Sequence, residues 1–449
     1  MSEKKKGQGV SRRDFIKIAG AGSLAAGALG PAFLFPERAA AQQKTLKILQ
    51  WSHFVPAWDE WFNKTYTVEW GQKNNTVVTV DNINLTQLQA RAQSEVAAKK
   101  GHDLFMLLSP PAAYEDQVLD MTHVYKEVEK KWGKKIDLAH KSTYNPKTKK
   151  YFAFSDAYTP DPGNYHKEWW AEAGYPNGPD TYDDLRAGAK KIRDKNGIPC
   201  GLGLSQELDT SMAMRALLWS FGGAEQDEHG NVTLNSKNTI EALKYMKALY
   251  QESENAQVFS WTPPSNNIAM LGGKVSYVAN AISITRQAER EHNPIDSKIG
   301  VCKTPKGPTR RIAAEHVMNC YVIWNFAENK EGAQKFLIDY MDHFHDGFVA
   351  GQFYNFPCFP KTVPNLATEI ANDPRSTPPD RYKVLTDVLD WATNVGYPGY
   401  ASAAIDEAFN TWVIPTMFAK VARGDESPED AAAAAHKEYQ RIFDRFNKK

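Results

Sequence analysis

The clearest hydrophobic pattern in the chain is an alternation of short apolar runs with longer amphipathic stretches. The runs 45–51, 76–80 and 103–108 have the pattern of β-strands. Between them, the Trp-rich segment 58–62 and the Ala- and Gln-rich segment 85–100 have the pattern of helices. This β-α-β-α-β order predicts a largely parallel sheet with crossover helices.

The pattern recurs further along the chain with different spacing. Segment 151–156 is expected to be a strand, and 181–193, 238–251 and 331–340 are expected to be amphipathic helices. A last helix is expected after Ser427, which is followed by a Pro and two acidic residues suited to a first turn. No Pro/Gly/Ser-rich tether interrupts the chain, so two α/β lobes joined by strands are expected.

The first forty residues have the pattern of an export signal. The twin-arginine run 11–17 is followed by the weakly apolar stretch 18–35, rich in Ala and Gly, and by the small residues 39–41. A membrane anchor is the alternative, but a spanning helix needs about 20 strongly apolar residues. We therefore predict a Tat signal peptide over 1–41, cleavage after Ala41, and a mature protein in the periplasm.

Length and charge narrow the possible functions. The whole chain has 54 Lys and Arg against 53 Asp and Glu, and the predicted leader takes away seven and three of them, leaving 47 against 50. This near-neutral balance predicts no nucleic-acid partner and gives no electrostatic reason to bind an anionic membrane. The remaining residues exceed what one hydrophobic core usually serves, which again favours two lobes.

The chain has four cysteines and no Cys-x-x-Cys motif, so neither a zinc ribbon nor a thioredoxin-like site is indicated. Cys302 and Cys320 could pair if their strands are neighbours, with free buried thiols as the alternative. The other two are Cys200 and Cys358.

Motifs for cofactors and catalysis are almost missing from the sequence. Gly201-Leu202-Gly203 lacks a third glycine, and no Walker loop, His-Glu-x-x-His or Gly-x-Ser-x-Gly occurs. His343 and His345 have a metal-chelating spacing only on a strand, and here they follow a predicted helix, so a solvated helix end is expected. We expect no cofactor, no metal and no enzymatic activity.

The 12 Trp and 19 Tyr are the positive finding, because many of them stand beside polar residues at predicted strand ends or loops. Aromatic faces rimmed by hydrogen-bonding groups suit a sugar, whose C–H faces stack on rings and whose hydroxyls need partners. Core packing is the alternative for each single ring. The groups are 51–54, Tyr158, Trp261, 353–356 and 397–400.

Six ordered segments carry a resemblance to a known family. The most specific of them runs from Asn164 to Leu185 and contains Asn-Tyr-His-Lys-Glu, Ala-Gly-Tyr and Pro-Asp-Thr-Tyr-Asp-Asp-Leu. The chain resembles the extracellular solute-binding proteins of bacterial ABC importers, family 1, the group that includes maltose-binding proteins. The resemblance covers essentially everything after the leader. The other segments are 51–54 with the preceding strand, 103–106, 151–156, 269–280 and 329–337, with Pro305-Lys306-Gly307 between the last two.

This resemblance implies an α/β, two-lobe periplasmic-binding-protein fold of type II. Each lobe would be a mainly parallel sheet flanked by helices, and hinge strands would join the lobes. The implied lobes are 44–156 plus 279–325 and 157–278 plus 326–449, with hinges near 155–158, 275–280 and 324–327. The implied protein is a monomer that holds a small solute, a carbohydrate first of all, between its lobes and delivers it to the transmembrane subunits of an ABC permease.

Site residues carried over from the family stand at strand ends and crossings. Asp156 would accept hydrogen bonds from adjacent hydroxyls, Asn280 would donate and accept, and Tyr158 or Tyr400 would stack on the sugar. A salt bridge between the lobes is the alternative role of Asp156. The full set is His53, Phe54, Ser109, Asp156, Tyr158, Asn280, Glu315, His316, Phe356, Tyr397 and Tyr400.

Two departures from the family pattern leave the identity of the solute open. Family members often have a glycine pair at Glu315-His316 and a Trp near 282–285. A polyamine or another cationic, amino-acid-like solute, held by Asp156, Asp161 and Glu315, is therefore the second hypothesis. An exported enzyme on the same scaffold is the third, although the sequence offers no acid-base pair or cofactor for it.

Overall fold

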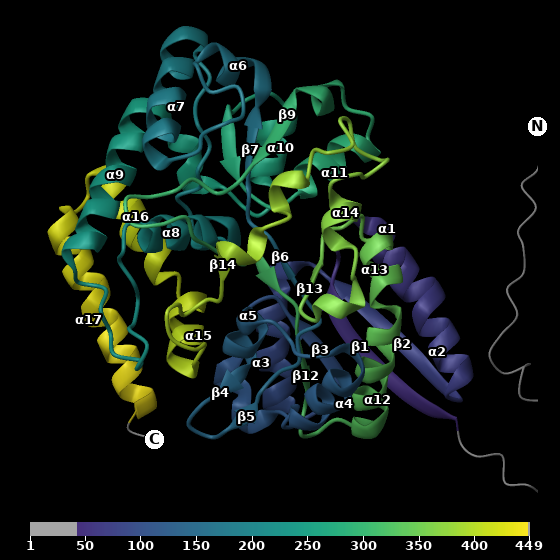
Figure 1. The fold of residues 1–449 in the computed structure, drawn as a ribbon. Helices are drawn as coiled ribbons and strands as arrows, with labels where there is room; N and C mark the ends of the chain where they lie inside the picture. The colour runs from purple at the N-terminus through teal and green to yellow at the C-terminus, as the bar shows by residue number, and fades with distance from the viewer. Residues whose placement is uncertain (1–42, 448–449) are drawn as a thin grey trace, which may run out of the picture. The chain divides into compact units, whose positions relative to one another are not determined.

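The computed structural model describes residues 43–447, so the predicted leader lies outside the described residues. Its largest sheet has the strand order β12-β3-β1-β2 (Figure 1). Strands β1 (Lys44–Trp51), β2 (Thr76–Ile83) and β3 (Leu104–Leu107) are parallel, and β12 (Cys320–Ile323) pairs antiparallel with β3. The predicted strand-helix alternation over this part of the chain is confirmed.

Helices from two distant parts of the chain cover this sheet. After β1 come α1 (Pro56–Trp61), a π-helical turn (Phe62–Tyr66) and α2 (Thr67–Lys73), and α3 (Leu88–Ala98) leads from β2 toward β3. Helices α12 (Lys330–Tyr340) and α13 (Phe344–Ala350) pack beside them, as Figure 1 shows in green next to purple. Their contact is largely aromatic: the ring centroids of Tyr66 and Phe336 are 5.2 Å apart.

A second sheet has the order β8-β7-β9, from β7 (Gly163–His166), β8 (Tyr277–Ala279) and β9 (Ile299–Cys302). A mainly parallel sheet was expected here, but this sheet is antiparallel, because β7 runs antiparallel to both of its neighbours. Gly163, where β7 begins, pairs with Ala279 and Cys302, where β8 and β9 end. One edge of this sheet therefore collects the start of β7 and the ends of the other two strands.

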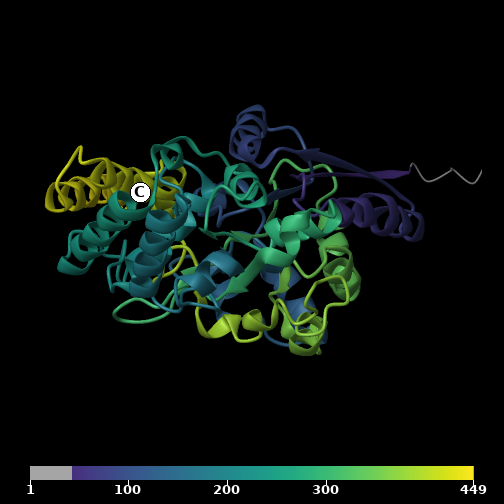
Figure 2. The ribbon, with the colours of Figure 1, turned by 90° about the horizontal axis from the view of Figure 1, so that it is seen from above.

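Most of the remaining helices lie on the side of the second sheet. The three of them that the sequence predicted, at 181–193, at 238–251 and after Ser427, are present within a few residues of the expected positions. Helix α8 (Leu208–Ser220) is buried along its whole length. Figures 1 and 2 both place α17 at the end of the described part opposite to α2. The other helices on this side are α6 (Lys167–Glu172), α7 (Tyr182–Asn196), α9 (Lys237–Ser253), α10 (Ser265–Leu271), α11 (Ser283–Arg290), α15 (Ala403–Asn410), α16 (Val413–Arg423) and α17 (Pro428–Asn447).

A small connecting sheet, with the order β11-β6-β13, stands between the two larger ones (Figure 1). It consists of β6 (Ala157–Thr159), β11 (Val317–Met318) and β13 (Phe356–Pro357). The expected strand 151–156 is wrong as a continuous element. Only its first residue belongs to a strand, β5 (Lys150–Tyr151), and Phe154 forms an isolated bridge to Tyr321. The apolar residues of this stretch are buried without a strand ladder, which sequence periodicity cannot distinguish from a strand.

The pairing also bears on the expected lobe boundaries. Strand β9 pairs with β7 in the second sheet, whereas 279–325 was expected in the lobe of the first. Helix α12 packs on β12 and on α4 (Thr122–Trp132), although 326–449 was expected in the lobe of the second. The chain therefore returns from the second sheet to the first after residue 302, whereas the return was expected near 279. It leaves the first sheet again after residue 340, whereas this was expected near 326.

All four cysteines are free and buried. Cys302 in β9 and Cys320 in β12 belong to different sheets, so the neighbouring strands that a disulfide between them would need are not present. His343 and His345 lie near the exposed junction of α12 and α13, where they contact Asp346 and Glu369 respectively. Within residues 43–447, no helix combines the length and apolar character needed to cross a bilayer.

The start of α7 gives a stability test. Thr181 accepts a hydrogen bond from the Asp184 amide and Asp184 accepts one from the Thr181 amide, both at 3.0 Å, which is a capping box. We expect Thr181→Ala to lower the free energy of unfolding by about 1 kcal/mol. Thr181→Ser, which keeps the hydroxyl, is the control. Urea unfolding monitored by circular dichroism measures both, and equal stability of the two variants would contradict the role of the cap.

Candidate functional site

A cavity of about 520 Å³ opens between elements of the two larger sheets, and we call it the cleft cavity. One wall is built from residues that follow β2 and end β3, and the other from the approach to α8, the loop before α10 and the end of α15. The described residues that line it are Leu85, Thr86, Leu88, Gln89, Ala90, Gln93, Leu107, Leu108, Ser109, Gln206, Glu207, Leu208, Trp261, Thr262, Pro263, Phe409, Asn410 and Trp412.

Strand direction explains the position of the cleft cavity. Strands β1, β2 and β3 are parallel, so their carboxyl ends meet at one edge, where the chain must leave the sheet through loops. In open α/β sheets this edge is where ligands are usually bound. Ser109, predicted from the sequence as a cleft residue, stands two residues after β3 and lines the cavity.

The lining of the cleft cavity combines rings, amides and hydroxyls with one charge. Trp261, Phe409 and Trp412 provide the aromatic surface. Glu207 is the single charged group among the lining residues, and no Lys, Arg or His stands there. Such a lining suits a neutral or cationic ligand better than an anionic one.

Glu207 links the cleft cavity to a buried cluster of charged groups. Its carboxylate caps α8 by accepting from the Asp209 amide at 2.8 Å and from the Thr210 amide at 2.5 Å. In the first turn of that helix, the Asp209 carboxylate lies 3.3 Å from Nε2 of His316. On the other side of the ring, Nδ1 of His316 is 3.1 Å from Asp161. The imidazole therefore bridges two carboxylates from different segments of the chain.

These neighbours shift the protonation of the cluster. Burial alone lowers the pKa of His316, but Asp209 and the hydrogen-bonded Asp161 outweigh it and raise the pKa to about 9. Burial and the like charge of Glu207 raise the pKa of Asp209 well above its usual range. His316 is therefore an imidazolium at neutral pH and balances part of the negative charge around it.

An asparagine network extends the cluster to the edge of the second sheet. Asn266 donates to Asp209, and Asn280 donates to Asn266 at 2.9 Å and to Asn267 at 2.7 Å. Asn280 directly follows β8 and is buried. The structure thus brings two of the predicted residues, His316 and Asn280, into one hydrogen-bonded network.

A second buried group surrounds His53 at the carboxyl end of β1. Burial lowers the pKa of His53 to about 4, so the ring is neutral. Its Nδ1 accepts from the Val55 amide at 2.8 Å, and its Nε2 faces the side-chain amide of Asn355 at 3.3 Å. The rings of Trp51, Trp58 and Tyr354 enclose it, with centroids within 5.3 Å of the His53 ring.

Tyr354 is buried beside His53. Burial first, and then the negative charges of Asp209 and Asp161, raise the pKa of its phenol well above the usual range. Two buried polar atoms of the group around His53, Trp51 Nε1 and Asn355 Oδ1, have no hydrogen-bond partner among the described residues.

Five other predicted residues are Tyr158, Phe356, Asp156 and Glu315, which lie outside both groups, and Phe54, which lies at the edge of the second. Tyr158 packs edge-on against Phe356 within the connecting sheet, with ring centroids 6.0 Å apart. The carboxylate of Asp156 is buried beside this sheet, and burial, only partly offset by hydrogen bonds that include those from Asn319 and Tyr340, raises its pKa to about 7. Glu315 accepts from the Val395 amide at 3.3 Å, and burial raises its pKa to about 8. Phe54, half-buried, stands edge-on to Trp51.

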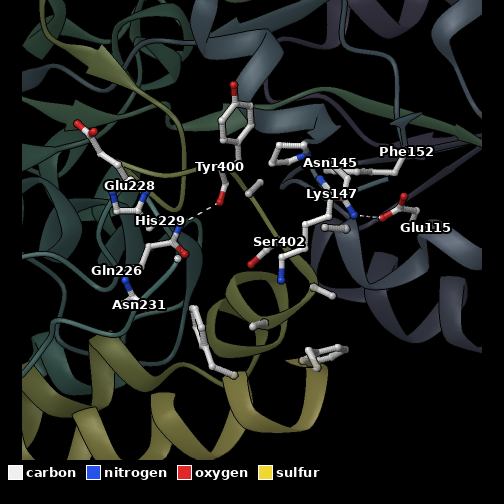
Figure 3. A pocket seen from close by; sticks show the side chains of 18 residues that line it. Glu115, Asn145, Lys147, Phe152, Gln226, Glu228, His229, Asn231, Tyr400 and Ser402 are labelled. Carbon is white, nitrogen blue, oxygen red and sulfur yellow. Dashed lines mark hydrogen bonds between the residues drawn. The ribbon is translucent and has the colours of Figure 1, made fainter. Parts of the chain in front are cut away.

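The last two predicted residues belong to another place. Tyr397 packs at a tilt against Trp219, with ring centroids 5.6 Å apart, and Tyr400 lines a separate cavity of about 330 Å³, which we call the rear cavity (Figure 3). The rear cavity does not share a lining residue with the cleft cavity and does not lie at the carboxyl ends of β1 to β3. We therefore take the cleft cavity as the candidate site for a solute.

Sequence reasoning missed Glu207, Asp209 and Trp412 as site residues. The signal for Glu207 was present, since an acidic residue directly before a run of apolar residues can cap a buried helix. Trp412 carries no such signal. Its backbone adopts φ 59°, a left-handed conformation that is rare for a bulky residue.

Comparison with known proteins adds the family. The family of bacterial extracellular solute-binding proteins matches residues 51–341, well over half of the chain. Binding proteins of Brucella abortus and Brucella suis are 28% identical over 175 residues, 38% of this chain and 42% of theirs, so the chain matches less than half of their length. An ABC transporter-binding protein of Deinococcus radiodurans is 27% identical over 157 residues, 33% of this chain and 37% of that protein.

Solved structures of sugar-bound proteins share the fold. A maltose-bound MalE3 of T. maritima has a TM-score of 0.72 and 20% identity, covering 89% of this chain and 99% of that one. A sugar transporter protein of Arthrobacter chlorophenolicus with bound laminaribiose has a TM-score of 0.73 and 16% identity over the same shares. These similarities confirm the two-lobe periplasmic-binding-protein fold.

The bridging imidazole gives a pH test. The pKa of His316 is higher in the folded protein, about 9, than the ordinary value of 6.5. Its contribution to stability is therefore complete below about pH 6.5 and is lost as the pH rises toward 9. Over this interval we expect unfolding free energy to fall by up to about 1.4 kcal/mol per pH unit from this group.

Urea unfolding between pH 6.5 and 9 measures this slope. In His316→Gln the slope should be smaller than in the wild type by that amount. His343→Gln, at an exposed position, is the matched control and should keep the wild-type slope. Identical slopes for wild type and His316→Gln would contradict a raised pKa of His316.

Proposed function

Because the chain belongs to the bacterial extracellular solute-binding proteins, we propose that it is the periplasmic solute receptor of an ABC importer. It captures a neutral carbohydrate in the cleft cavity and delivers it to the transmembrane subunits of the permease. It acts as a monomer and performs no covalent chemistry.

The lining of the cleft cavity carries the choice of a carbohydrate. Trp261, Phe409 and Trp412 offer ring faces for the C–H surface of a sugar. Side-chain amides and hydroxyls supply paired donors and acceptors for its hydroxyls. They come from Gln89, Gln93, Gln206, Asn410, Thr86, Ser109 and Thr262. A volume of about 520 Å³ falls within the usual range for small-molecule sites.

The proteins of similar fold support this choice. Besides the maltose and laminaribiose complexes, a solute-binding protein of Thermotoga lettingae with bound tagatose has a TM-score of 0.73 and 18% identity, covering 89% of this chain and 99% of that one. Their sequence identities are too low to carry single residues across. They support the solute class through the shared fold and the sugars that their structures hold.

Capture would use a change in the relative position of the two sheets. The connecting sheet and the segments around it are the passages between them, and His316, directly before β11, ties such a passage to Asp161 and Asp209 on the side of the second sheet. A solute that contacts both walls of the cleft cavity binds the closed arrangement better, so it shifts the population toward closure. The permease would recognise the closed arrangement.

A cationic solute is the second candidate, and Glu207 favours it. This carboxylate lines the cleft cavity with no basic residue beside it in the lining, and Asp209 follows two residues later. An ammonium group could replace part of the charge balance that His316 provides. The residues named for this hypothesis from the sequence are only partly suited to it, since Asp161 is already paired with His316 and Asp156 lies beside the connecting sheet.

The sugar hypothesis predicts a strong effect of one ring. Mature protein should be stabilised against thermal unfolding by one or more of maltose, laminaribiose and tagatose, because a ligand of the folded state raises the melting temperature. For the sugar that binds, Trp261→Ala should weaken the affinity at least about 10-fold, or about 1.4 kcal/mol. Isothermal titration calorimetry measures this change.

Trp132→Ala is the matched control. This half-buried Trp donates to Asp342 at 3.2 Å on the surface of α4, away from the cleft cavity, and its loss should leave sugar affinity unchanged. If a wider panel of neutral sugars and polyols gives no stabilisation, the carbohydrate proposal is wrong.

Salt and charge separate the two candidates. A neutral sugar should bind with the same affinity at low and high ionic strength, and Glu207→Gln should change that affinity only a few-fold. A cation such as putrescine should lose affinity as salt screens the carboxylates, and should lose most of it in Glu207→Gln. Titrations of both ligands at 20 and 500 mM NaCl decide between them.

A further inference from the structure

We propose that the rear cavity is a second small-molecule site, for a neutral polyhydroxylated molecule of monosaccharide size, and that its occupancy changes the solute affinity of the cleft cavity. The existence of the second site is independent of the proposed function. Its effect on affinity rests on that function.

The rear cavity is enclosed by segments that lie far apart in the sequence. Glu115, Asn145 and Phe152 come from the side of the first sheet. The loop 226–231 and the residues 400–404 come from the side of the second. In Figure 3, Tyr400 and Ser402 stand between the group around Gln226 and the group around Asn145. A volume of about 330 Å³ is at the lower end for ligand sites and suits a small ligand.

Internal hydrogen bonds hold the polar walls in place. The buried amide of Gln226 donates to the carbonyls of Gly396 at 2.6 Å and Tyr400 at 2.9 Å. Asp227 accepts from the backbone amides of His229 at 2.9 Å and Asn231 at 2.8 Å. A site whose walls are already fixed loses little entropy when it binds a ligand.

The chemistry of the lining points to a neutral, hydroxylated ligand. Phe152 and Phe443 are buried and supply apolar surface. Each wall pairs a carboxylate with a side chain that carries a nitrogen, so the hydroxyls of a ligand would find hydrogen-bonding groups on both sides. These pairs are Glu115 with Lys147 on one wall and Glu228 with His229 on the other.

Helix α15 connects the rear cavity with the cleft cavity. Its N-cap Ser402 and its first residues, Ala403 and Ala404, line the rear cavity. Its last residues, Phe409 and Asn410, line the cleft cavity. The helix has eight residues and is about 12 Å long, so the length of this one helix separates the two cavities.

The middle of α15 is tied to the opposite side. Asp406 accepts from the amide of Ala113 at 3.0 Å, and Asn410 donates to Asp406 at 2.6 Å. A helix moves as a rigid element, so a ligand that fixes its first turn also fixes Phe409 and Asn410. Coupling between two sites is reciprocal and is commonly 5-fold or more in affinity.

Fluorine NMR tests this proposal with ribitol and tagatose as probes. The mature protein is labelled with 4-fluorophenylalanine and 5-fluorotryptophan, and the signals of Phe443 and Trp261 are assigned with Phe443→Leu and Trp261→Phe. Phe443 reports on the rear cavity and Trp261 on the cleft cavity. We expect a saturable shift of the Phe443 signal with at least one probe, retained in Trp261→Ala.

Two variants remove the rear site by different means. Ala403→Phe places a ring in the cavity, and Phe152→Leu takes away a buried ring of its apolar wall. Both should abolish or weaken the Phe443 response about 5-fold or more. Ala367→Phe, on the exposed face of α14 (Leu366–Ile370), is the control for an added ring and should respond as the wild type does.

The outcomes separate this proposal from the proposed function. A Phe443 signal that is silent to both probes, or one that follows Trp261 and disappears in Trp261→Ala, overturns the second site and leaves the receptor role untouched. A responsive Phe443 with a silent Trp261 supports the second site and counts against the cleft cavity. With both sites active, unchanged cleft affinity in Ala403→Phe overturns the coupling through α15.

Discussion

The interaction on which the site depends is the pairing of His316 with Asp161 and Asp209. Three carboxylates, including Glu207, are buried close together, and charges of one sign in such a place repel each other strongly. A single imidazolium makes the arrangement possible by bridging two of them. It also joins the approach to β7, the start of α8 and the segment before β11. Removing one member of such a buried set leaves the other charges without a partner. The resulting loss of folding free energy is far larger than the net stabilisation that the intact set provides.

Much of the fold could be predicted from local patterns. The capping residue Thr181, the acidic first turn after Ser427 and the alternation in 45–51 are signals contained within a few residues. Local patterns predicted a strand over the segment 152–156, and this prediction is wrong. Its apolar residues are buried by contacts with distant segments and not by a strand ladder. The direction of β7 was equally inaccessible, since it depends on where the chain enters the second sheet.

The residues of the candidate site likewise differ in whether the sequence carries a signal for them. His316 and Asn280 were predicted from the positions that they share with a family, and the network that joins them passes through Asp209 and Asn266. Those two residues have no local signal, because their role comes from the approach of α8 and α10 to the sheet edge. The aromatic residues show the reverse difficulty. Tyr158 and Trp261 are both followed by Thr-Pro, and only the three-dimensional arrangement separates the first, a core ring, from the second, a wall of the cleft cavity.

The burial of all four thiols bears on whether the chain would be exported to the periplasm before or after it folds. Burial raises the pKa of Cys302 to about 12 and that of the other three well above the usual range, so none is a thiolate at neutral pH. A Tat leader, as predicted for 1–41, would direct export of the protein after it has folded. In that order of events each sulfur would be shielded before it met an oxidising compartment and its disulfide-forming enzymes. If the same chain crossed the membrane unfolded, all four thiols would be exposed in the oxidising compartment and could form non-native disulfides.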